Sequence, residues 1–324
     1  MPLPASIRPF LGYLKRAFDF RSFRVAGLIQ RNLPNIAWPL TRASGGQITA
    51  EAIGLTFDPL KFEPLVEQMR PLATIVSSGL GTLEMQNGVP TLLAGPVRVA
   101  LDNSETVNIV AEVFGEGAYD FSPLKEALVV DIGMNVGIAA LYFAGIKGWE
   151  VVGYEPFPAT FATAQRHIEA SGLTGKIEAR NLGLSDRDGT ETLPFDPFRT
   201  GRNGLFYREV YNESHATQEI RLSDAATAFR ELRERAGDRA LVVKMDCEGA
   251  EYAIFRRLVE EDLLSTIDAI VLEFHPFVPG QSALDLERML LDAGFFVHLP
   301  RARAKSVDLM WGVRLANRTP PTAN

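Results

Sequence analysis

Cysteine is nearly absent from this sequence, since Cys247 is the only one among its 324 residues. A single cysteine excludes an internal disulfide framework and a zinc site built from several cysteines. Long apolar runs are missing as well: no window approaches eighteen consecutive apolar residues, which argues against a transmembrane helix. The N-terminus has scattered charges in place of the apolar stretch of a secretion signal. We therefore expect a cytoplasmic protein.

Positive charge is also in deficit, with 33 Lys and Arg against 40 Asp and Glu and a net charge of −7. Nucleic-acid phosphates require clustered positive charge, so we expect no nucleic-acid partner. Residues 1–33 are the exception, because they carry six basic residues and Asp19 alone, with Leu14 and Phe18 among the apolar residues between them. Such a basic amphipathic helix can contact an anionic membrane surface. Packing on the protein with a solvated basic face is the simpler interpretation, and both stay open.

The first part of the chain is interrupted by five prolines, so we expect a mostly helical accessory region over residues 1–82. An Asn-Gly pair at 87–88 between apolar runs predicts a β-hairpin. It opens a β-rich lead-in over 83–126. The domain that carries the chemistry is expected over 83–318, followed by a disordered tail at 319–324.

From residue 127 onward, strands and helices alternate. The predicted strands are ALVVDIG, WEVVGYEP, KIEARNLGLSD, ALVVKMD and IDAIVLEFHP. This order is typical of a doubly wound α/β fold, in which a mostly parallel sheet is covered by helices on both faces. FFVHLP and VDLMWGVRLAN follow the last helix with no helix between them, which predicts an antiparallel hairpin at the C-terminal edge. Ligands of such sheets bind at the carboxyl ends of the strands, near the topological switch point.

The segment VVDIGMNVG, residues 129–137, runs from a strand through a turn into a helix. Gly133 and Gly137 allow the backbone to approach a ligand closely, and Asp131 could hold a cationic amino group. Glu155 ends the next strand, where a carboxylate suits the hydroxyl pair of a ribose. These features fit either a nicotinamide dinucleotide or S-adenosylmethionine.

The turn between strand and helix distinguishes the two cofactors. A dinucleotide site favours G-x-G-x-x-G, whereas this turn has D-x-G-x-N-x-G with Asn135 at its centre. An acid and polar groups suit the zwitterionic methionine end of S-adenosylmethionine better than a pyrophosphate. We therefore predict S-adenosylmethionine as the cofactor. A nicotinamide-dependent oxidoreductase, or a non-catalytic protein that binds the cofactor or uses the fold for interactions, are the alternatives.

Five segments in this order and spacing resemble the FkbM-type S-adenosylmethionine-dependent methyltransferases: VVDIGMNVG, GYEPFPATFA, RNLGLSDRDG, VVKMDCEGAEY and IVLEFHP. The resemblance covers about residues 95–315, and Met134 departs from it by standing where the family usually has alanine. It implies a class I methyltransferase fold with a seven-stranded sheet, and methyl transfer to oxygen, commonly on sugars, glycolipids or polyketide-like molecules. Its motifs add Pro156, Asn181 and Leu182 to the predicted cofactor site.

Charge gathers where the strand of LVVKMDCEGAEY, residues 241–252, leaves the core. A strand period of two would place Lys244, Asp246 and Glu248 on one side and Cys247 on the other. Asp246 is predicted to lie nearest the transferred methyl group and the acceptor oxygen. Lys244 is expected to pair with a carboxylate, because a lone buried ammonium is unfavourable. Cys247 is interpreted as a small buried hydrophobic residue.

The next strand ends with Glu273 and His275 on a shared side. His275 is predicted to be the general base, because imidazole titrates near neutral pH, while Glu248 and Glu273 would orient substrate hydroxyls. Glu251 begins a helix, where a structural role is equally plausible. Asp246, Glu248, Glu273 and His275 could also bind a divalent metal ion. Sequence proximity does not establish coordination geometry, so the predicted site includes no metal.

The segment 195–217 is rich in Arg, Asn and aromatic residues. Loops in this position often cover a polar substrate, so we interpret it as a lid; a solvated connector is the alternative. Among the other histidines, His215 in this segment has a claim to the substrate side. Together these features predict an O-methyltransferase that acts on a hydroxyl of a carbohydrate or glycoconjugate, with a small-molecule or glycan acceptor.

Overall fold

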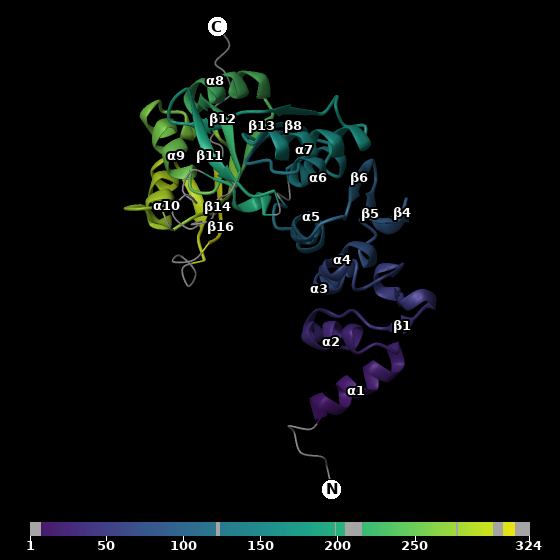
Figure 1. Ribbon diagram of the computed structural model, residues 1–324. Helices are drawn as coiled ribbons and strands as arrows, with labels where there is room; N and C mark the ends of the chain where they lie inside the picture. Colours follow the sequence, from purple (N-terminus) through teal and green to yellow (C-terminus); the bar gives the residue numbers. More distant parts are fainter. Residues whose placement is uncertain are drawn as a thin grey trace. The chain divides into compact units, whose positions relative to one another are not determined.

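The computed structural model describes residues 8–120, 124–197, 199–204, 216–276, 278–300 and 307–314. The predicted tail, His215 and most of the predicted lid lie outside these residues. The chain forms two compact units, Met1–Ala118 and Tyr119–Asn324, which are described separately (Figure 1).

The first unit begins with helices and a small sheet. Its α-helices are α1 (Arg8–Phe20), α2 (Phe23–Arg31), α3 (Glu63–Glu67) and α4 (Met69–Ser77), and short 3₁₀ turns occupy Leu33–Asn35, Ser44–Gly46 and Glu51–Ile53. The strands β1 (Leu40–Arg42), β2 (Ile48–Ala50) and β3 (Leu55–Phe57) form an antiparallel sheet in that order. The sequence analysis missed this sheet, because strands of three residues are too short to show an alternating pattern.

The predicted hairpin is confirmed. Strands β4 (Thr82–Gln86) and β5 (Val89–Ala94) pair antiparallel, and β6 (Val97–Ala100) continues the sheet. Asn87 and Gly88 between them have φ angles of 51° and 78°, as a two-residue hairpin turn requires.

The lead-in belongs with the first unit. After β6 come α5 (Ser104–Val110) and the π-helical turn η4 (Ala111–Glu116), which pack against α3 and α4. These contacts extend the first compact unit to Ala118, whereas the sequence analysis placed the boundary at residue 82.

The second unit contains a seven-stranded sheet in the order β15-β16-β14-β13-β7-β8-β9. The strands are β7 (Ala127–Ile132), β8 (Glu150–Tyr154), β9 (Ile177–Arg180), β13 (Ala240–Met245), β14 (Ala269–Phe274), β15 (Phe295–His298) and β16 (Asp308–Arg314). Strands β9, β8, β7, β13 and β14 are parallel, and β16 lies antiparallel between β14 and β15. The mostly parallel sheet and the antiparallel pair at its C-terminal edge agree with the prediction.

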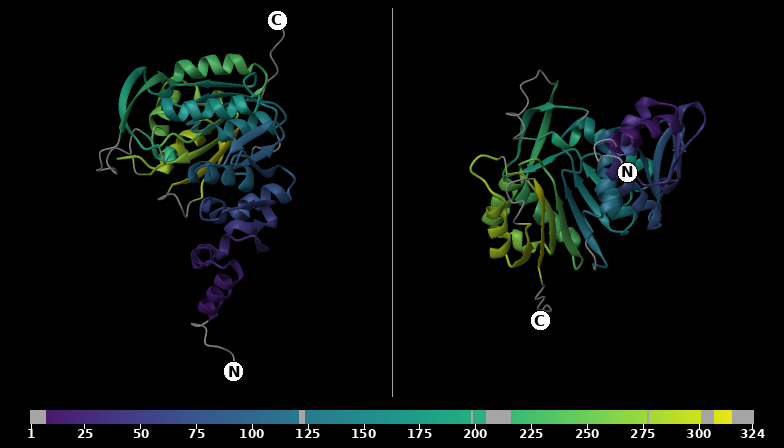
Figure 2. Two further views of the ribbon diagram at one scale, coloured as in Figure 1. Left: turned by 45° about the vertical axis from the view of Figure 1, so that its right-hand side comes forward. Right: turned by 90° about the horizontal axis from the view of Figure 1, so that it is seen from below.

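Helices lie on both faces of this sheet (Figures 1 and 2). They are α6 (Ile138–Gly145), α7 (Pro158–Ala170), α8 (Ala225–Ala236), α9 (Glu251–Glu260) and α10 (Ala283–Asp292), with a 3₁₀ turn at Leu264–Thr266. Phe229, Phe255 and Leu286 from α8, α9 and α10 pack in one buried cluster with alternate residues of β7 and β13. Helices α6 and α7 pack against β7, β8 and β9. Because side chains along a strand alternate between the two faces of the sheet, the helices on each face pack in a separate layer.

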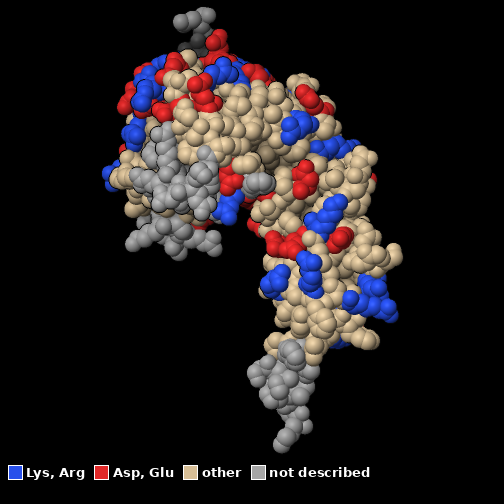
Figure 3. Space-filling model, viewed as in Figure 1, with Lys and Arg blue, Asp and Glu red and all other residues tan. Residues whose placement is uncertain are grey.

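The exterior of this unit mixes charges of both signs. In Figure 3, basic and acidic side chains are interspersed around α8, where Arg230 pairs with Glu261 and Arg233 with Asp268. Exposed pairs of this kind add little stability, and they form no extended positive surface there.

A third small sheet was not predicted. It contains β10 (Gly183–Ser185), β12 (Ala216–Asp224) and β11 (Gly189–Phe195) in that order. The segment KIEARNLGLSD, predicted as one strand, divides between β9 and β10, which belong to different sheets. Leu193, Phe195 and Ile220 pack with Phe157 beneath this sheet. Between β11 and β12 lies the 3₁₀ turn Thr200–Arg202.

The order of the main sheet reverses between β7 and β13. Chain progression runs outward from β7 to β8 and β9 on one side, and from β13 to β14 on the other. Ile132 and Met245 are paired in register at the carboxyl ends of the two central strands. The residues that follow them, Gly133 and Asp246, therefore meet at the topological switch point, where ligands of such sheets bind.

Candidate active site

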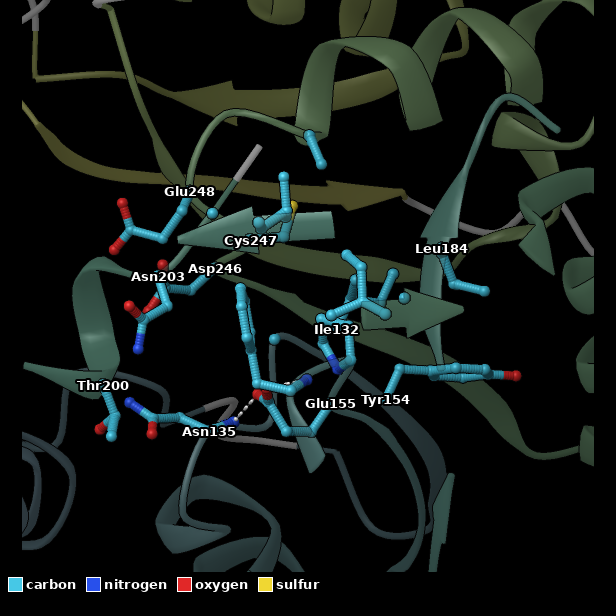
Figure 4. A pocket seen from close by; sticks show the side chains of 18 of the residues that line it. Ile132, Asn135, Tyr154, Glu155, Leu184, Thr200, Asn203, Asp246, Cys247 and Glu248 are labelled. Carbon is cyan, nitrogen blue, oxygen red and sulfur yellow. Dashed lines mark hydrogen bonds between the residues drawn. The ribbon is translucent and has the colours of Figure 1, made fainter. Parts of the chain in front are cut away.

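A cleft of about 650 Å³ opens at this switch point (Figure 4). One side of it is apolar, and the other carries polar side chains that include Asn135, Thr200, Asn203, Asp246 and Glu248. The apolar side is lined by Ile132, Tyr154, Pro156, Phe157, Leu184, Leu193, Ile220 and Leu222. A cleft with an apolar wall and a few polar groups is typical of a small-molecule site.

Gly133 is required by the way in which the two central strands end. It has a φ of 74°, and a side chain on it would overlap the carbonyl oxygen of Asp246. The Asp246 N–H donates to the Ile132 carbonyl at 2.9 Å, which holds the two chain segments together. The glycine therefore permits both a left-handed turn and a close approach of backbone, as predicted for a ligand-binding turn.

Glu155 organises the turn after β7. Its two carboxylate oxygens accept the backbone N–H groups of Asn135 (2.9 Å) and Phe157 (3.0 Å). Burial raises the pKa of this carboxyl to about 7, against the opposing effect of the two N–H donors. The side chain amide of Asn181 donates to the carbonyls of Glu155 and Pro156, which fixes this segment in place.

The structure brings half of the predicted cofactor residues to the cleft. Gly133, Asn135, Glu155 and Pro156 line it. Within the described part of the chain, the other four stand outside the lining: Asp131, Gly137, Asn181 and Leu182. Asn181 and Leu182 precede the residues that do line it, Gly183 and Leu184. Gly137, with a φ of 84°, begins α6 and packs on Ala164 of α7.

Asp131 pairs with a cationic amino group, as predicted, but the group is the side chain ammonium of Lys244 and not part of a ligand. The two residues are neighbours in register on β7 and β13, both side chains are buried, and Lys244 Nζ lies 3.1 Å from Asp131 Oδ1. Burial raises the pKa of Asp131, an effect that the Lys244 charge opposes. Lys244 also donates to the Gly133 carbonyl at 2.7 Å. The predicted pairing of Lys244 is thus present, and Asp131 is buried away from the cleft.

Three acids surround His275, which follows β14. Its Nδ1 lies 3.2 Å from Glu251 Oε1, and its Nε2 lies 3.3 Å from Glu248 Oε2 and 3.6 Å from Glu273 Oε1. Glu251 also accepts the His275 backbone N–H at 2.8 Å. Glu251 is fully buried, so its role is to hold the histidine in addition to beginning α9. The predicted convergence of the two strand ends is therefore present.

The surroundings of His275 oppose its predicted role as a general base. Burial alone would lower the pKa of His275, but the hydrogen bond and charge of Glu251 and the charge of Glu248 raise it to about 9. The ring is then a cation at neutral pH and has no free lone pair to accept a proton. It is 1% exposed and, among the described residues, does not belong to the lining of the cleft. It can act on a ligand through Glu248.

Asp246 and Glu248 reach the cleft, whereas Glu273 lies behind Glu248 beside His275. The strand ends at Met245, so the predicted alternation does not continue to Glu248. Glu248 instead adopts a left-handed φ of 53°, and burial raises the pKa of its carboxyl to about 9. This turn of the backbone brings its side chain toward both the cleft and His275.

The described part of the predicted lid covers the polar side of the cleft. Thr200 and Asn203 line it, and a side chain on Gly204 would overlap Glu248 Cβ. The Asn203 amide exchanges hydrogen bonds with the backbone of Asp196, which closes this loop on itself. The residues after Gly204 lie outside the described residues up to β12.

Several polar atoms in this cleft are buried without a hydrogen-bond partner among the described residues. They are Asn135 Oδ1, Thr200 Oγ1 and Asp246 Oδ1, while Glu248 Oε2 lies 3.3 Å from the His275 ring nitrogen Nε2. Figure 4 shows the four side chains around one space. Buried polar atoms are rarely left unpaired, so a ligand that donates several hydrogen bonds would complete this side of the cleft.

Ligand atoms of Asp246, Glu273 and His275 lie within 4.8 Å of one another. These residue types can bind a divalent ion, so the metal alternative raised by the sequence stays open. Cys247 packs partly against the core, and its thiol contacts Glu251 at 3.7 Å. Burial raises its pKa well above the usual value, so it is unsuited to act as a nucleophile.

Comparisons with known proteins show what this chain is similar to. The chain is 28% identical to Methyltransferase 1 of Beauveria bassiana over 228 residues, which cover 64% of this chain and 88% of the fungal protein. It is 25% identical to the AMB antimetabolite synthetase AmbE of Pseudomonas aeruginosa over 223 residues, 57% of this chain and 10% of that protein.

Among solved structures, a putative tRNA (m1A22) methyltransferase of Streptococcus pneumoniae in complex with S-adenosyl-L-methionine has a TM-score of 0.33 and 16% identity. The match covers 57% of this chain and 64% of that chain, less than two thirds of its length. The model of the methyltransferase FkbM domain matches residues 131–297, just over half of the sequence. This chain therefore belongs to the FkbM methyltransferase family.

Proposed function

We propose that this protein transfers the methyl group of S-adenosylmethionine to a hydroxyl of a carbohydrate, a glycolipid or a similar polyhydroxylated molecule. The observation that carries the proposal is the set of unpartnered polar atoms in the cleft, two of which, Asn135 Oδ1 and Asp246 Oδ1, are amide and carboxylate oxygens that act as hydrogen-bond acceptors. A ligand rich in hydroxyl and ammonium donors satisfies such atoms. Family membership favours methyl transfer over the nicotinamide alternative.

The cleft has what the cofactor would need. S-Adenosylmethionine supplies a methyl group carried on a positively charged sulfur. The apolar wall formed by Tyr154, Leu184 and Leu222 suits an aromatic base, and the free lone pairs of Glu155 suit a pair of ribose hydroxyls. The unpartnered side chain oxygen of Asn135 suits an ammonium group.

Asp246 and Glu248 are the residues we assign to the acceptor. Asp246 presents a carboxylate oxygen without a partner to the cleft and would accept the hydrogen of the reacting hydroxyl. Glu248, with a raised pKa, can donate or accept a hydrogen bond and would orient a second hydroxyl. His275 and Glu273 would act as positioning residues, since His275 contacts Glu248 and holds Glu273 beside it.

Product identification tests the proposal. The protein is incubated with methyl-labelled S-adenosylmethionine and fractions of glycans, glycolipids and glycosylated small molecules, and labelled products are identified by mass spectrometry. We expect methylation of a hydroxyl. Asp246→Asn should lower turnover by about 100-fold or more, because it replaces the carboxylate that accepts the proton.

The matched control is Asp292→Asn, which changes an exposed acid at the end of α10 and should leave turnover unchanged. Calorimetry with each cofactor separates the alternatives. Binding of NADH without binding of S-adenosylmethionine would overturn the proposal, and so would a product methylated on nitrogen or carbon. Full turnover of Asp246→Asn would remove Asp246 from the acceptor site.

A further inference from the structure

The first two helices expose large apolar side chains on the side away from their packed face. Phe18 is 83% exposed and Phe23 is 66% exposed, whereas Ala17 and Phe20 in the same region are buried. Leu14, one turn before Phe18 on α1, is also exposed. Packing on the protein therefore accounts for one face of α1 and leaves a second apolar face unexplained.

These exposed side chains are gathered in one place. Leu14, Phe18 and Phe23 line a single surface groove together with Arg21 and Arg42. We call these five residues the α1–α2 surface. Phe23 also packs beside Tyr13, with ring centroids 6.1 Å apart, which holds its ring outward at this position. Scattered apolar residues are normal on a protein surface, but a cluster of this kind marks an interaction site.

The charge around this surface has one dominant sign. Residues 8–42 contain seven Arg and Lys and one acid, Asp19, in a chain whose net charge is −7. Asp19 lines the groove as well, and the exposed cations near it in sequence include Lys15 and Arg24 in addition to Arg21 and Arg42. Cations flanking exposed phenylalanine side chains complement a partner that has anionic groups at its surface and apolar groups just beneath.

We propose that the α1–α2 surface binds to the headgroup region of an anionic lipid bilayer. Phe18, Phe23 and Leu14 would enter the boundary between headgroups and acyl chains, and the flanking cations would contact anionic headgroups. No helix in the part of the chain that the structure describes is long and apolar enough to cross a membrane, so the contact would be peripheral. This inference does not depend on the proposed reaction.

Vesicle sedimentation of the full-length protein tests the proposal. Vesicles of phosphatidylcholine are compared with vesicles that also contain phosphatidylglycerol. We expect sedimentation with the anionic vesicles and at least about tenfold weaker binding to phosphatidylcholine alone. Phe18→Ser combined with Phe23→Ser should weaken binding to anionic vesicles by at least about tenfold, because each phenylalanine loses its apolar burial. Added salt should weaken binding as well.

Phe296→Ser is the matched control, because Phe296 on β15 is 74% exposed and belongs to the other unit. It should bind vesicles as the unaltered protein does, and circular dichroism verifies that all variants are folded. Equal sedimentation of the Phe18→Ser, Phe23→Ser variant, or no sedimentation of the unaltered protein, would overturn the proposal. So would a dimer without lipid that this double variant dissociates, since the surface would then bind a second copy of the chain.

Discussion

At the scale of single residues, His275 links the stability of the protein to pH. Its folded pKa of about 9 lies above the ordinary value of 6.5. The charged ring therefore stabilises the fold below about pH 6.5, and this contribution is lost as the pH rises through about 9. Glu248, whose pKa is also raised, changes stability in the same direction. Glu155, with a pKa of about 7, has largely finished its own titration by then.

We therefore expect the free energy of unfolding to fall by about 1 to 3 kcal/mol between about pH 7 and pH 9. Urea denaturation at several pH values measures it. His275→Gln should make the decrease smaller, because the titrating ring is gone, while Asp292→Asn should leave it unchanged. The same decrease in the unaltered protein and in His275→Gln would contradict the assignment.

The sequence predicted which side chains reach the cleft better than it predicted their contacts. Asp246 and Glu248 reach the cleft because they follow the strand at the switch point, a position visible in the sequence. The partners of Asp131 and His275 were not predicted, because they come from other elements. Lys244 faces Asp131 only through strand register, and Glu251 reaches His275 from the start of α9. Such contacts between different elements determine the pKa of each side chain, and the spacing of residues along the sequence does not show them.

At the scale of elements, the turn after β7 packs closely against β8, where the Met134 side chain contacts Gly153. Met134 is 2% exposed, and a side chain on Gly153 of β8 would overlap its sulfur. The long Met134 side chain is thus accommodated by a glycine on the neighbouring strand.

Gly153→Ala should lower the free energy of unfolding by about 1 to 3 kcal/mol, because it overpacks this contact. Adding Met134→Ala to Gly153→Ala should recover part of that loss, since the smaller side chain removes the overlap. Thermal or urea denaturation of both single variants and the double variant gives the coupling energy. Additive effects of the two substitutions would show that the contact does not limit the packing.

The buried strands were predictable, and the third sheet was not. Every residue of β7 is buried, and all of them except Asp131 are apolar, so the strand is easily recognised. Strands β11 and β12 are mostly exposed, with only Leu193, Phe195, Ile220 and Asp224 buried, and their sequences contain no such apolar run. Their contribution of Leu193, Ile220 and Leu222 to the cleft was therefore missed as well.

At the scale of the whole molecule, the chain consists of two compact units that each bury apolar side chains of their own. We expect two transitions in scanning calorimetry. Saturating S-adenosylmethionine should raise only the transition of residues 119–324, because the cleft lies within that unit. The shift grows with the ratio of cofactor concentration to its dissociation constant.

Glu155→Gln should reduce this shift, since the residue predicted to hold the ribose is altered, and Phe18→Ser should leave it unchanged. A single calorimetric transition that moves to higher temperature with S-adenosylmethionine would show that the two units unfold together. The same comparison separates the two proposals, because the α1–α2 surface and the cleft belong to different units.

The left-handed backbone of Glu248 implies a compromise between stability and activity. A residue other than glycine, asparagine or aspartate is unfavourable at a φ of 53°, and glycine would relieve that strain while removing the carboxylate. Selection for thermal tolerance alone would therefore favour glycine at position 248, and selection for methyl transfer would retain the acid. A library of variants at position 248 can be selected once for thermal tolerance and once for methyl transfer. Glycine after the first selection and glutamate after the second would show that the strained backbone serves activity.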